Sequence, residues 1–344
     1  MNNAFLAKGV RRSLNSIRYV TPVMPGSASG LVAKVYAQAE RDFGFPAAPT
    51  VMHSPAPELT AAHWAMLRET LLVTGSASRS EKEVVAAAVS AGNTCPYCVA
   101  VHSAAARATG TDPDSITDPG LKSIADWARS SGQPRQSPLA SDSYAELAGV
   151  AVNFQYLNRM VSVFLPDSPL PPLTPKPIGA WVMDQLASAM TSPSPAPGAS
   201  LELLPDAPLP AEFAWASGAP DIASTFARAA AVIDEAGQKS IQPRVREFVL
   251  GVLDGWNGQP PGPSRAWADA EVAKLANPDR AAGRLAILTA LAPYQVTKAD
   301  VTALRRSPDS ASGTDEALLA LTAWASMAAA RKISSWLPQP ATSG

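Results

Sequence analysis

Hydrophobic residues recur at helical spacing along most of this chain. Between residues 29 and 43 apolar side chains fall three or four positions apart, and a glycine at position 44 follows them. The same spacing, interrupted by glycine and proline, predicts further helices in the first half of the chain at 61–74, 83–91, 95–109, 118–130 and 143–165. Four prolines between positions 46 and 57 predict an extended segment between the first two helices.

A proline-rich segment then separates two helical regions. Residues 166–220 hold 13 of the 33 prolines. Proline-rich segments form stiff spacers rather than long helices. A short helix at 178–190 interrupts it and makes Trp181 and Met183 available to dock on a neighbour. Helical patterns return at 223–236, 245–253, 266–276, 280–292, 298–305 and 315–337. The expected organisation is an arm, a first domain, a linker, a second helical domain and a tail, at 1–21, 22–165, 166–220, 221–338 and 339–344.

Composition and charge narrow the class of protein. With 344 residues, 47% of them hydrophobic, the chain has ample material for a core. The net charge of −1 and the lack of a lysine or arginine run argue against a nucleic-acid surface. Residues 1–20 are basic but lack the apolar core of a secretory signal, and no run reaches the length of a membrane span. We expect a soluble protein.

Both cysteines of the chain lie close to a histidine. Cys95 and Cys98 are three positions apart and His102 follows four positions later, so all three side chains share one face of a helix. Pro96 suits the first turn of that helix, and Gly92 ends the preceding helix, with Asn93 or Thr94 as the expected cap. A thiol in the first turn meets unpaired N–H groups, which favour the thiolate.

The preceding helix supplies a carboxylate, Glu83, twelve residues before the first cysteine. His102 can accept the thiol proton, and Glu83 can orient the imidazole ring. This arrangement predicts a redox-active dithiol with its own base. A zinc site would need about four ligands in a closed cage, which one cysteine pair, one histidine and one glutamate only just supply. A disulfide across so short a loop would stabilise little, and a bare Cys-x-x-Cys pair also occurs by chance.

The spacing Glu-x11-Cys-x2-Cys-x3-His resembles the signature of the alkylhydroperoxidase D family, within the carboxymuconolactone decarboxylase superfamily. Here it reads Glu83, Cys95, Cys98 and His102, and the flanking residues resemble the peroxidase-related branch. The resemblance implies an all-α, AhpD-like fold and reduction of hydroperoxides. It implies that Cys98 attacks the peroxide, that Cys95 resolves it, and that Glu83 and His102 relay the proton. Some members carry a second histidine at the position of Tyr97, so no relay role is carried over to that residue.

The second half echoes the first without its chemistry. Residues 154–165 align with 326–337, and 96–99 align with 293–296. In the latter register the four reactive positions hold other residues, Arg280, Ala292, Gln295 and Ala299. We expect a duplicated fold whose second copy is degenerate, although alanine-rich helices also resemble one another by chance. The family resemblance further implies a homo-oligomer.

The leading hypothesis is a thiol-dependent hydroperoxidase or dithiol–disulfide oxidoreductase. Its partners would be a hydroperoxide substrate and an external dithiol or protein reductant, with no nucleic acid and no membrane. A reactive cysteine pair suits the reducing cytoplasm. No cofactor or metal is expected, because no haem, flavin or nicotinamide motif is present. The alternatives are a carboxymuconolactone decarboxylase-like enzyme, whose branch typically lacks the cysteine pair, or a non-enzymatic helical assembly protein that senses redox state or binds zinc.

Three further residues are candidates for the same site. His53 lies in the expected extended segment and His63 near the start of the next helix, where a single histidine is usually a surface or capping residue. Arg159 is a polar residue within the apolar pattern of the longest helix of the first half. Arg159 either contacts the relay or forms a salt bridge with a partner helix.

Overall fold

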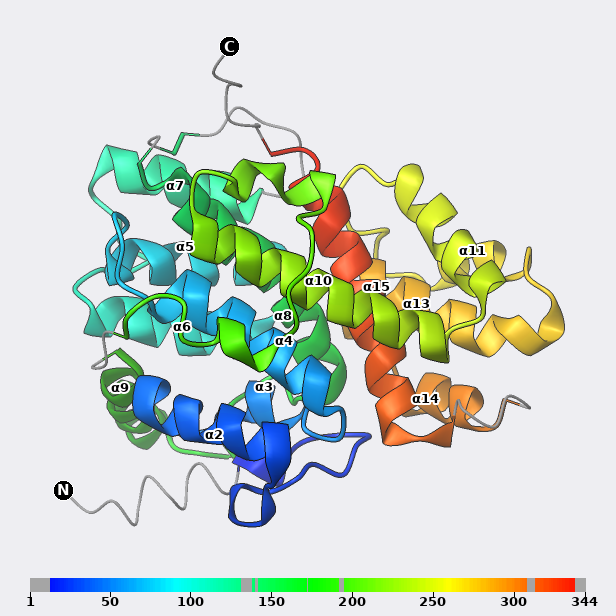
Figure 1. Cartoon of the computed structure of the whole chain (residues 1–344). Helices are drawn as coiled ribbons and strands as arrows, with labels where there is room; N and C mark the ends of the chain where they lie inside the picture. Colours follow the sequence, from blue (N-terminus) through cyan, green and yellow to red (C-terminus); the bar gives the residue numbers. More distant parts are fainter. Residues whose placement is uncertain are drawn as a thin grey trace.

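The computed structural model describes residues 13–130, 138–139, 142–171, 173–191, 195–307 and 313–337, and within them every regular element is helical (Figure 1). The predicted all-α class is therefore confirmed. The first half comprises α2 Gly30–Phe43, α3 Ala48–Val51, α4 Pro57–Leu67, α5 Arg79–Gly92, α6 Pro96–Ala108, α7 Pro119–Arg129 and α8 Tyr144–Phe164. The rest comprises α9 Lys176–Thr191, α10 Pro220–Ser240, α11 Pro243–Asp254, α12 Ala266–Val272, α13 Arg280–Leu291, α14 Lys298–Arg305 and α15 Asp315–Ser334.

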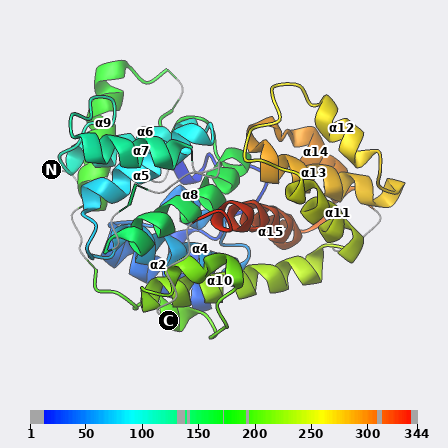
Figure 2. The ribbon, with the colours of Figure 1, turned by 90° about the horizontal axis from the view of Figure 1, so that it is seen from above.

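Two long helices, α8 and α15, pack against each other in the middle of the molecule (Figure 2). Both are buried along most of their length, which is why their sequences are apolar on every side rather than along one stripe. Helix α5 covers α8 on one side, and α13 covers α15 on the other. The core therefore runs continuously from the first half of the chain into the second.

The helices that pack around α8 in the first half have counterparts around α15 in the second half. Helix α5 packs on both α6 and α8, α13 packs on both α14 and α15, and α4 contacts α10 across the middle. Pro96 begins α6, and the aligned Pro293 begins a 3₁₀ turn, Pro293–Gln295, that ends after three residues. This arrangement is compatible with a duplication, which stays a prediction.

Several helices begin earlier than their hydrophobic pattern indicates. Helix α5 starts at Arg79 rather than at 83, because Ser78 and Glu81 form a capping box ahead of it. The segment expected to be extended between the first two helices instead contains the short helix α3, with Pro49 in its first turn. Proline costs no hydrogen bond there, so the density of prolines was a poor guide to this segment.

The proline-rich segment at 166–220 packs on the first half of the chain. Its helix α9 is longer than predicted and contacts α6 and α2. Beyond α9, the chain is held by a π-helical turn, Arg68–Leu72, that continues α4. Arg68 donates to the carbonyl of Ala196, and Glu69 accepts from the backbone and hydroxyl of Ser200. These contacts fasten the chain on the far side of α9 to the body of the first half.

Within the part of the chain that the structure describes, no helix is both long and apolar enough to cross a membrane.

Candidate active site

A tight turn between α5 and α6 presents the two cysteines. Thr94 adopts a left-handed backbone conformation, with φ of +54°, and Cys95 is the residue that caps α6. The predicted turn and the place of Pro96 in the first helical turn are therefore confirmed, whereas the cap is Cys95 and not Asn93 or Thr94. This turn places Cys98 within the first helical turn, where unpaired N–H groups favour a negative charge.

The two thiols are in direct contact. Their sulfur atoms lie 3.0 Å apart, and the two residues are 1% and 2% exposed. Both cysteines are free in this structure. The dithiol, Cys95 and Cys98, is therefore a pre-assembled pair that needs only a small movement to form a bond.

The pKa values of the two thiols are shifted in opposite directions. The hydrogen bond with Cys98 lowers the pKa of the Cys95 thiol and outweighs the effect of its burial. Burial raises the pKa of the Cys98 thiol, and the neighbouring sulfur of Cys95 raises it further. The pair thus loses its first proton more readily than an isolated thiol and its second with more difficulty, as expected of two groups that titrate together.

The carboxylate of Glu83 lies 2.7 Å from Nδ1 of His102. Burial on its own raises the pKa of Glu83, but the charge of Arg79 and the hydrogen bonds from His102 and Arg79 outweigh it, so the pKa is lowered. An ionised carboxylate can only accept, so Nδ1 of His102 carries the proton and Nε2 is left to accept one. Glu83 and His102, called the relay pair below after the role that the sequence resemblance implies for them, are therefore in direct contact.

Arg79 completes the relay pair from the start of α5. Its Nε donates to Glu83 across 2.8 Å, and its Nη2 donates to the backbone carbonyl of Met190 on α9 across 3.3 Å. Arg79 lies one helical turn before Glu83 on the same helix. The carboxylate is thus held between a guanidinium and an imidazole, and only the latter was expected.

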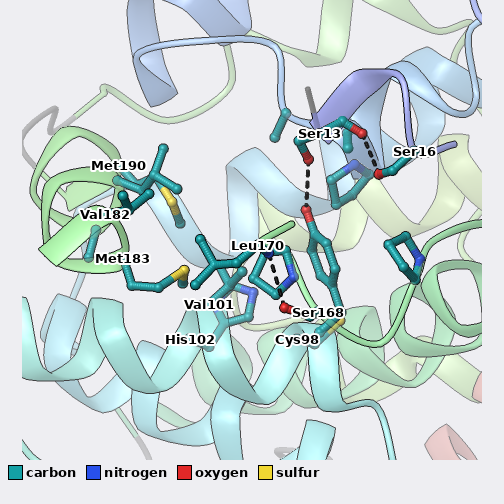
Figure 3. Close-up of a pocket in the computed structure, with 18 of the residues that line it drawn as sticks. Ser13, Ser16, Cys98, Val101, His102, Ser168, Leu170, Val182, Met183 and Met190 are labelled. Carbon is teal, nitrogen blue, oxygen red and sulfur yellow. Dashed lines mark hydrogen bonds between the residues drawn. The ribbon is translucent and has the colours of Figure 1, made fainter. Parts of the chain in front are cut away.

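A large cavity brings one cysteine and the histidine to a common surface. It has a volume of about 1390 Å³, and Cys98 and His102 are both part of its wall (Figure 3). Cys95 lies behind Cys98, and Glu83 lies behind His102. Neither belongs to the described part of the cavity wall. Since Cys98 and His102 are one helical turn apart, a molecule in the cavity can reach both.

Helix α9 and the chain before it form one side of this cavity. Val182, Met183 and Met190 face Cys98 and His102 across the space, and Leu170 lies between them (Figure 3). Met183, which was expected to be available to dock on a neighbour, is part of this cavity wall. The proline-rich segment, predicted from composition as a spacer, therefore supplies one wall of the site.

Several polar residues behind the dithiol were not predicted to belong to the site. Asn158 on α8 donates to Ser90 across 3.0 Å and accepts from Asn93. Asn158 and Ser90 also hydrogen-bond the sulfur of Cys98 and oppose the rise in its pKa, whereas Ser162 contributes to the lowered pKa of Cys95. The available signal was a set of polar residues inside the apolar pattern of α8.

Tyr97 also lies on the cavity wall. Its hydroxyl is 3.5 Å from Ser13 of the N-terminal segment (Figure 3). Burial raises the pKa of Tyr97 to about 12, so the hydroxyl stays protonated at neutral pH. It can donate a hydrogen bond, but it does not gain or lose a proton near neutral pH as a second histidine would.

His53 and His63 are buried side by side, contrary to the expectation of a surface or capping role. Their rings stack at 4.5 Å, and His53 also bonds to Tyr156 across 3.0 Å. Neither is part of the described cavity wall. His53 lies in the turn that follows α3, and its Nδ1 bonds to the backbone carbonyl of Pro49 on that helix. Burial lowers the pKa of His53 to about 4 and holds that of His63 well below its usual value.

Arg159 takes neither of its two expected roles. It donates to the backbone carbonyl of Ala290 on α13 and to Gln155 on its own helix, and its guanidinium lies over the ring of Trp256. These contacts link α8 to the second half of the chain, away from the relay pair. Among the residues that the structure describes, no group of three or more histidine, cysteine, aspartate or glutamate side chains is placed to hold a metal ion.

Comparison with known proteins places this site in a family. Residues 57–118, which include the dithiol and the relay pair, match the carboxymuconolactone decarboxylase family. The chain belongs to this family. It is 38% identical over 339 residues to alkyl hydroperoxide reductase Rv2159c of Mycobacterium tuberculosis strain H37Rv, across 93% of this chain and 95% of that protein.

A solved structure also resembles part of the chain. It is the crystal structure of an alkylhydroperoxidase AhpD core, an uncharacterized peroxidase-related protein from Ralstonia eutropha JMP134. The match has a TM-score of 0.37 and 18% identity, and covers 43% of this chain and 90% of that one.

Proposed function

We propose that this protein is a thiol-dependent alkyl hydroperoxidase in which Cys98 attacks the peroxide and Cys95 resolves the product. The observation that carries the proposal is that Cys98 and His102 open together into one cavity, with Cys95 in contact behind Cys98. The similarity to a protein named alkyl hydroperoxide reductase supports the same reaction class.

In the first step the Cys98 thiolate attacks the terminal oxygen of the hydroperoxide. The O–O bond breaks, Cys98 becomes a sulfenic acid and the substrate leaves as an alkoxide, which takes up one proton. His102 accepts the proton of the thiol at Nε2 and then returns it to the alkoxide. Glu83 holds the ring in the required tautomer and stabilises its positive charge while the proton is held.

In the second step the thiol of Cys95 displaces water from the sulfenic acid, and a disulfide between Cys95 and Cys98 forms. The sulfur atoms are already in contact, so this step needs no rearrangement of α6. An external dithiol or protein reductant then restores both thiols by thiol–disulfide exchange. The overall balance is one hydroperoxide and two thiols converted to one alcohol, one water and one disulfide.

The choice between the two sulfurs rests on access. The lower pKa belongs to Cys95, but Cys98 is the cysteine on the described cavity wall. Because the sulfurs are 3.0 Å apart, the remaining proton of the pair can move to Cys95 and leave the charge on Cys98. A thiolate that the peroxide can reach then reacts, even though it is the minor form.

Single-turnover mass spectrometry tests this assignment. The reduced protein is mixed with one equivalent of tert-butyl hydroperoxide, and the masses of the peptides that carry Cys95 and Cys98 are determined. Wild type is expected to give the internal disulfide, Cys95→Ser a sulfenic acid trapped on Cys98, and Cys98→Ser unmodified protein. Cys98→Ser protein that consumed the peroxide as fast as wild type would overturn the mechanism.

The remaining features of the proposal concern the setting of the enzyme. A reactive dithiol that must be kept reduced suits the cytoplasm. The second half of the chain, in which the reactive positions hold other residues, serves as a packing partner for α8 and as the second copy of a duplicated fold. Further self-association into a homo-oligomer is part of the same proposal, and size-exclusion chromatography with light scattering tests it.

A further inference from the structure

We infer that the cavity selects a long, uncharged, apolar hydroperoxide, such as an esterified lipid hydroperoxide, over small or anionic ones. This inference rests on the proposed function and adds the substrate class to it. Three properties of the cavity carry it: its size, the chemistry of its wall and the exposed apolar residues at its edge.

The cavity is larger than the reaction requires. Reduction of hydrogen peroxide or a short alkyl hydroperoxide needs room for only a few heavy atoms beside Cys98 and His102. The volume of about 1390 Å³ exceeds the roughly 300–1,000 Å³ that usually accommodates a drug-sized ligand. Filling the space around a small peroxide with water would give up the exclusion of solvent that favours the reaction.

The wall of the cavity is mainly apolar. Beyond Cys98 and His102, most of its residues are aliphatic, aromatic or methionine side chains, and α9 contributes the largest share. Methionine side chains such as those of Met183 and Met190 are flexible and adapt to irregular apolar ligands. Burial of an alkyl chain against this wall is favourable in proportion to the apolar surface that it removes from water.

The charge of the wall disfavours an anionic substrate. Among the described residues that line the cavity, none is lysine or arginine, and Asp167 is the one carboxylate. A free fatty acid hydroperoxide would therefore bring its carboxylate to a wall whose described residues include one carboxylate and neither lysine nor arginine. The charge of Asp167 also reaches the dithiol, where it opposes the lowering of the Cys95 pKa that the hydrogen bond with Cys98 produces.

An exposed apolar edge continues the cavity to the surface. Leu173, Ile178 and Trp181 line the cavity and are also 100%, 50% and 42% exposed. Leu173 also has a φ of +63°, a backbone conformation that leucine rarely adopts. An apolar substrate that enters at this edge would cover side chains that are otherwise exposed to water.

A matched substrate series tests the inference in single turnover of the reduced protein, which needs no external reductant. Methyl linoleate hydroperoxide and linoleic acid hydroperoxide share one chain and differ in charge, while tert-butyl hydroperoxide and hydrogen peroxide are small. The second-order rate constant for loss of thiol is expected to be highest for the ester, at least about tenfold above the acid, since each tenfold step corresponds to about 1.4 kcal/mol. Equal rate constants for all four would overturn the inference.

Substitutions in the cavity wall should change the order of the substrates. Gln185→Lys adds a cation to the wall and is expected to raise the rate with the acid relative to the ester, and Asp167→Asn should do the same more weakly. Ala187→Trp fills the space beneath α9 and should slow the ester while sparing tert-butyl hydroperoxide. If the three variants leave the ratios of wild type unchanged, the cavity does not select the substrate.

The exposed edge has a matched control in the second half of the chain. Leu250 on α11 is 48% exposed and lies away from the described cavity wall. Leu173→Ser should slow the reaction with the ester several-fold, whereas Leu250→Ser should leave it unchanged. Equal effects of the two substitutions would count against an entrance at Leu173.

Failure of this inference can be told apart from failure of the proposed function. If Cys98→Ser abolishes reaction with every member of the series but wild type shows no preference, only the substrate class is wrong. If Cys98→Ser reacts like wild type with tert-butyl hydroperoxide, the proposed function itself is wrong. Binding of unoxidised methyl linoleate to Cys98→Ser protein, measured by calorimetry, gives a further readout independent of catalysis, and no binding would contradict the inference.

Discussion

Arg79 on α5 donates a hydrogen bond to the backbone carbonyl of Met190 on α9, so one side chain joins the relay pair to the helix that covers the cavity. The same guanidinium holds the carboxylate of Glu83 at 2.8 Å. One residue outside the four-residue motif therefore contacts both the carboxylate that binds His102 and the helix α9. We regard Arg79 as a positioning residue, because it does not reach the cavity itself.

Arg79→Met should slow peroxide reduction and shift its pH profile. Arg79 is among the charges that lower the pKa of the buried Glu83, so without it that pKa rises and the carboxylate takes up a proton at a higher pH. The acidic limb of the rate profile should therefore move to higher pH, with a loss of folding free energy of about 1–3 kcal/mol from an unsatisfied buried acceptor. Rates of thiol loss measured from pH 5 to 9, together with urea unfolding, check this prediction.

A surface arginine provides the control for this variant. Arg107 on α6 pairs with Asp112, and both side chains are 44% exposed. Arg107→Met should change the folding free energy by less than about 1 kcal/mol and leave the pH profile in place. An unchanged dependence of the rate on pH in Arg79→Met protein would show that Arg79 does not act on the relay pair.

The two thiols are expected to ionise in two separated steps. The hydrogen bond with Cys98 lowers the pKa of Cys95, and burial together with the neighbouring sulfur raises the pKa of Cys98. Ultraviolet absorbance of thiolate against pH should show one step below the usual thiol range and one above it. In Cys98→Ala protein the hydrogen bond is lost, so the pKa of Cys95 should rise. A single step for two thiols in wild type would contradict this coupling.

Asn158→Leu should reduce the reactivity of Cys98 with little change in shape. The amide hydrogen-bonds the sulfur and favours its thiolate, so its loss should lower the rate of peroxide reaction about tenfold, the effect of roughly 1.4 kcal/mol. Asn153 lies on the same helix and is also buried, but it donates to Thr70 instead. Asn153→Leu should alter stability without altering the rate, and equal rates for the two variants would exclude this role of Asn158.

The buried histidines predict a loss of stability in mild acid. Unfolded histidine binds a proton near pH 6.5, whereas burial lowers the folded pKa of His53 to about 4 and that of His63 well below its usual value. Between these values the unfolded state holds more protons, so the unfolding free energy falls as pH decreases. The slope should reach about 1.4 kcal/mol per pH unit for each histidine.

Urea unfolding of wild type and His63→Phe at pH 7, 6 and 5 measures that slope. The variant should have a shallower slope by the share of one histidine. Tyr156→Phe removes a hydrogen-bond partner of His53 but keeps both rings, so it should lower stability at every pH and leave the slope unchanged. Identical slopes for wild type and His63→Phe would mean that His63 is not held neutral.

The sequence was informative where function depends on local geometry. Helical spacing placed Cys95, Cys98 and His102 on one face, and the glycine and proline between the two helices indicated the turn that brings Glu83 back to them. These relations involve residues fewer than twenty positions apart, so helix periodicity and turn preferences are sufficient to predict them. The contact of Glu83 with His102 at 2.7 Å agrees with that prediction.

Contacts between segments that are distant in the sequence could not be predicted from helix periodicity and turn preferences. Asn158 reaches Cys98 because α8 packs on α5 and α6, and Met190 meets Arg79 because α9 folds back over α6. Composition described the chain around α9 as a spacer, since proline density reports local stiffness and not what the segment packs against. His53 and Arg159 were misplaced for a related reason: a polar residue in an apolar pattern signals burial but does not identify its partner.

The contacts of Arg68 with Ala196 and of Glu69 with Ser200 have a consequence for the cavity wall that α9 forms. They attach the chain beyond α9 to the π-helical turn that follows α4, and α8 ends shortly before the segment that leads into α9. Helix α9 is therefore held to the first half of the chain on both sides by the same polypeptide. The cavity wall that α9 forms thus does not depend on a second subunit, and its presence should be independent of protein concentration.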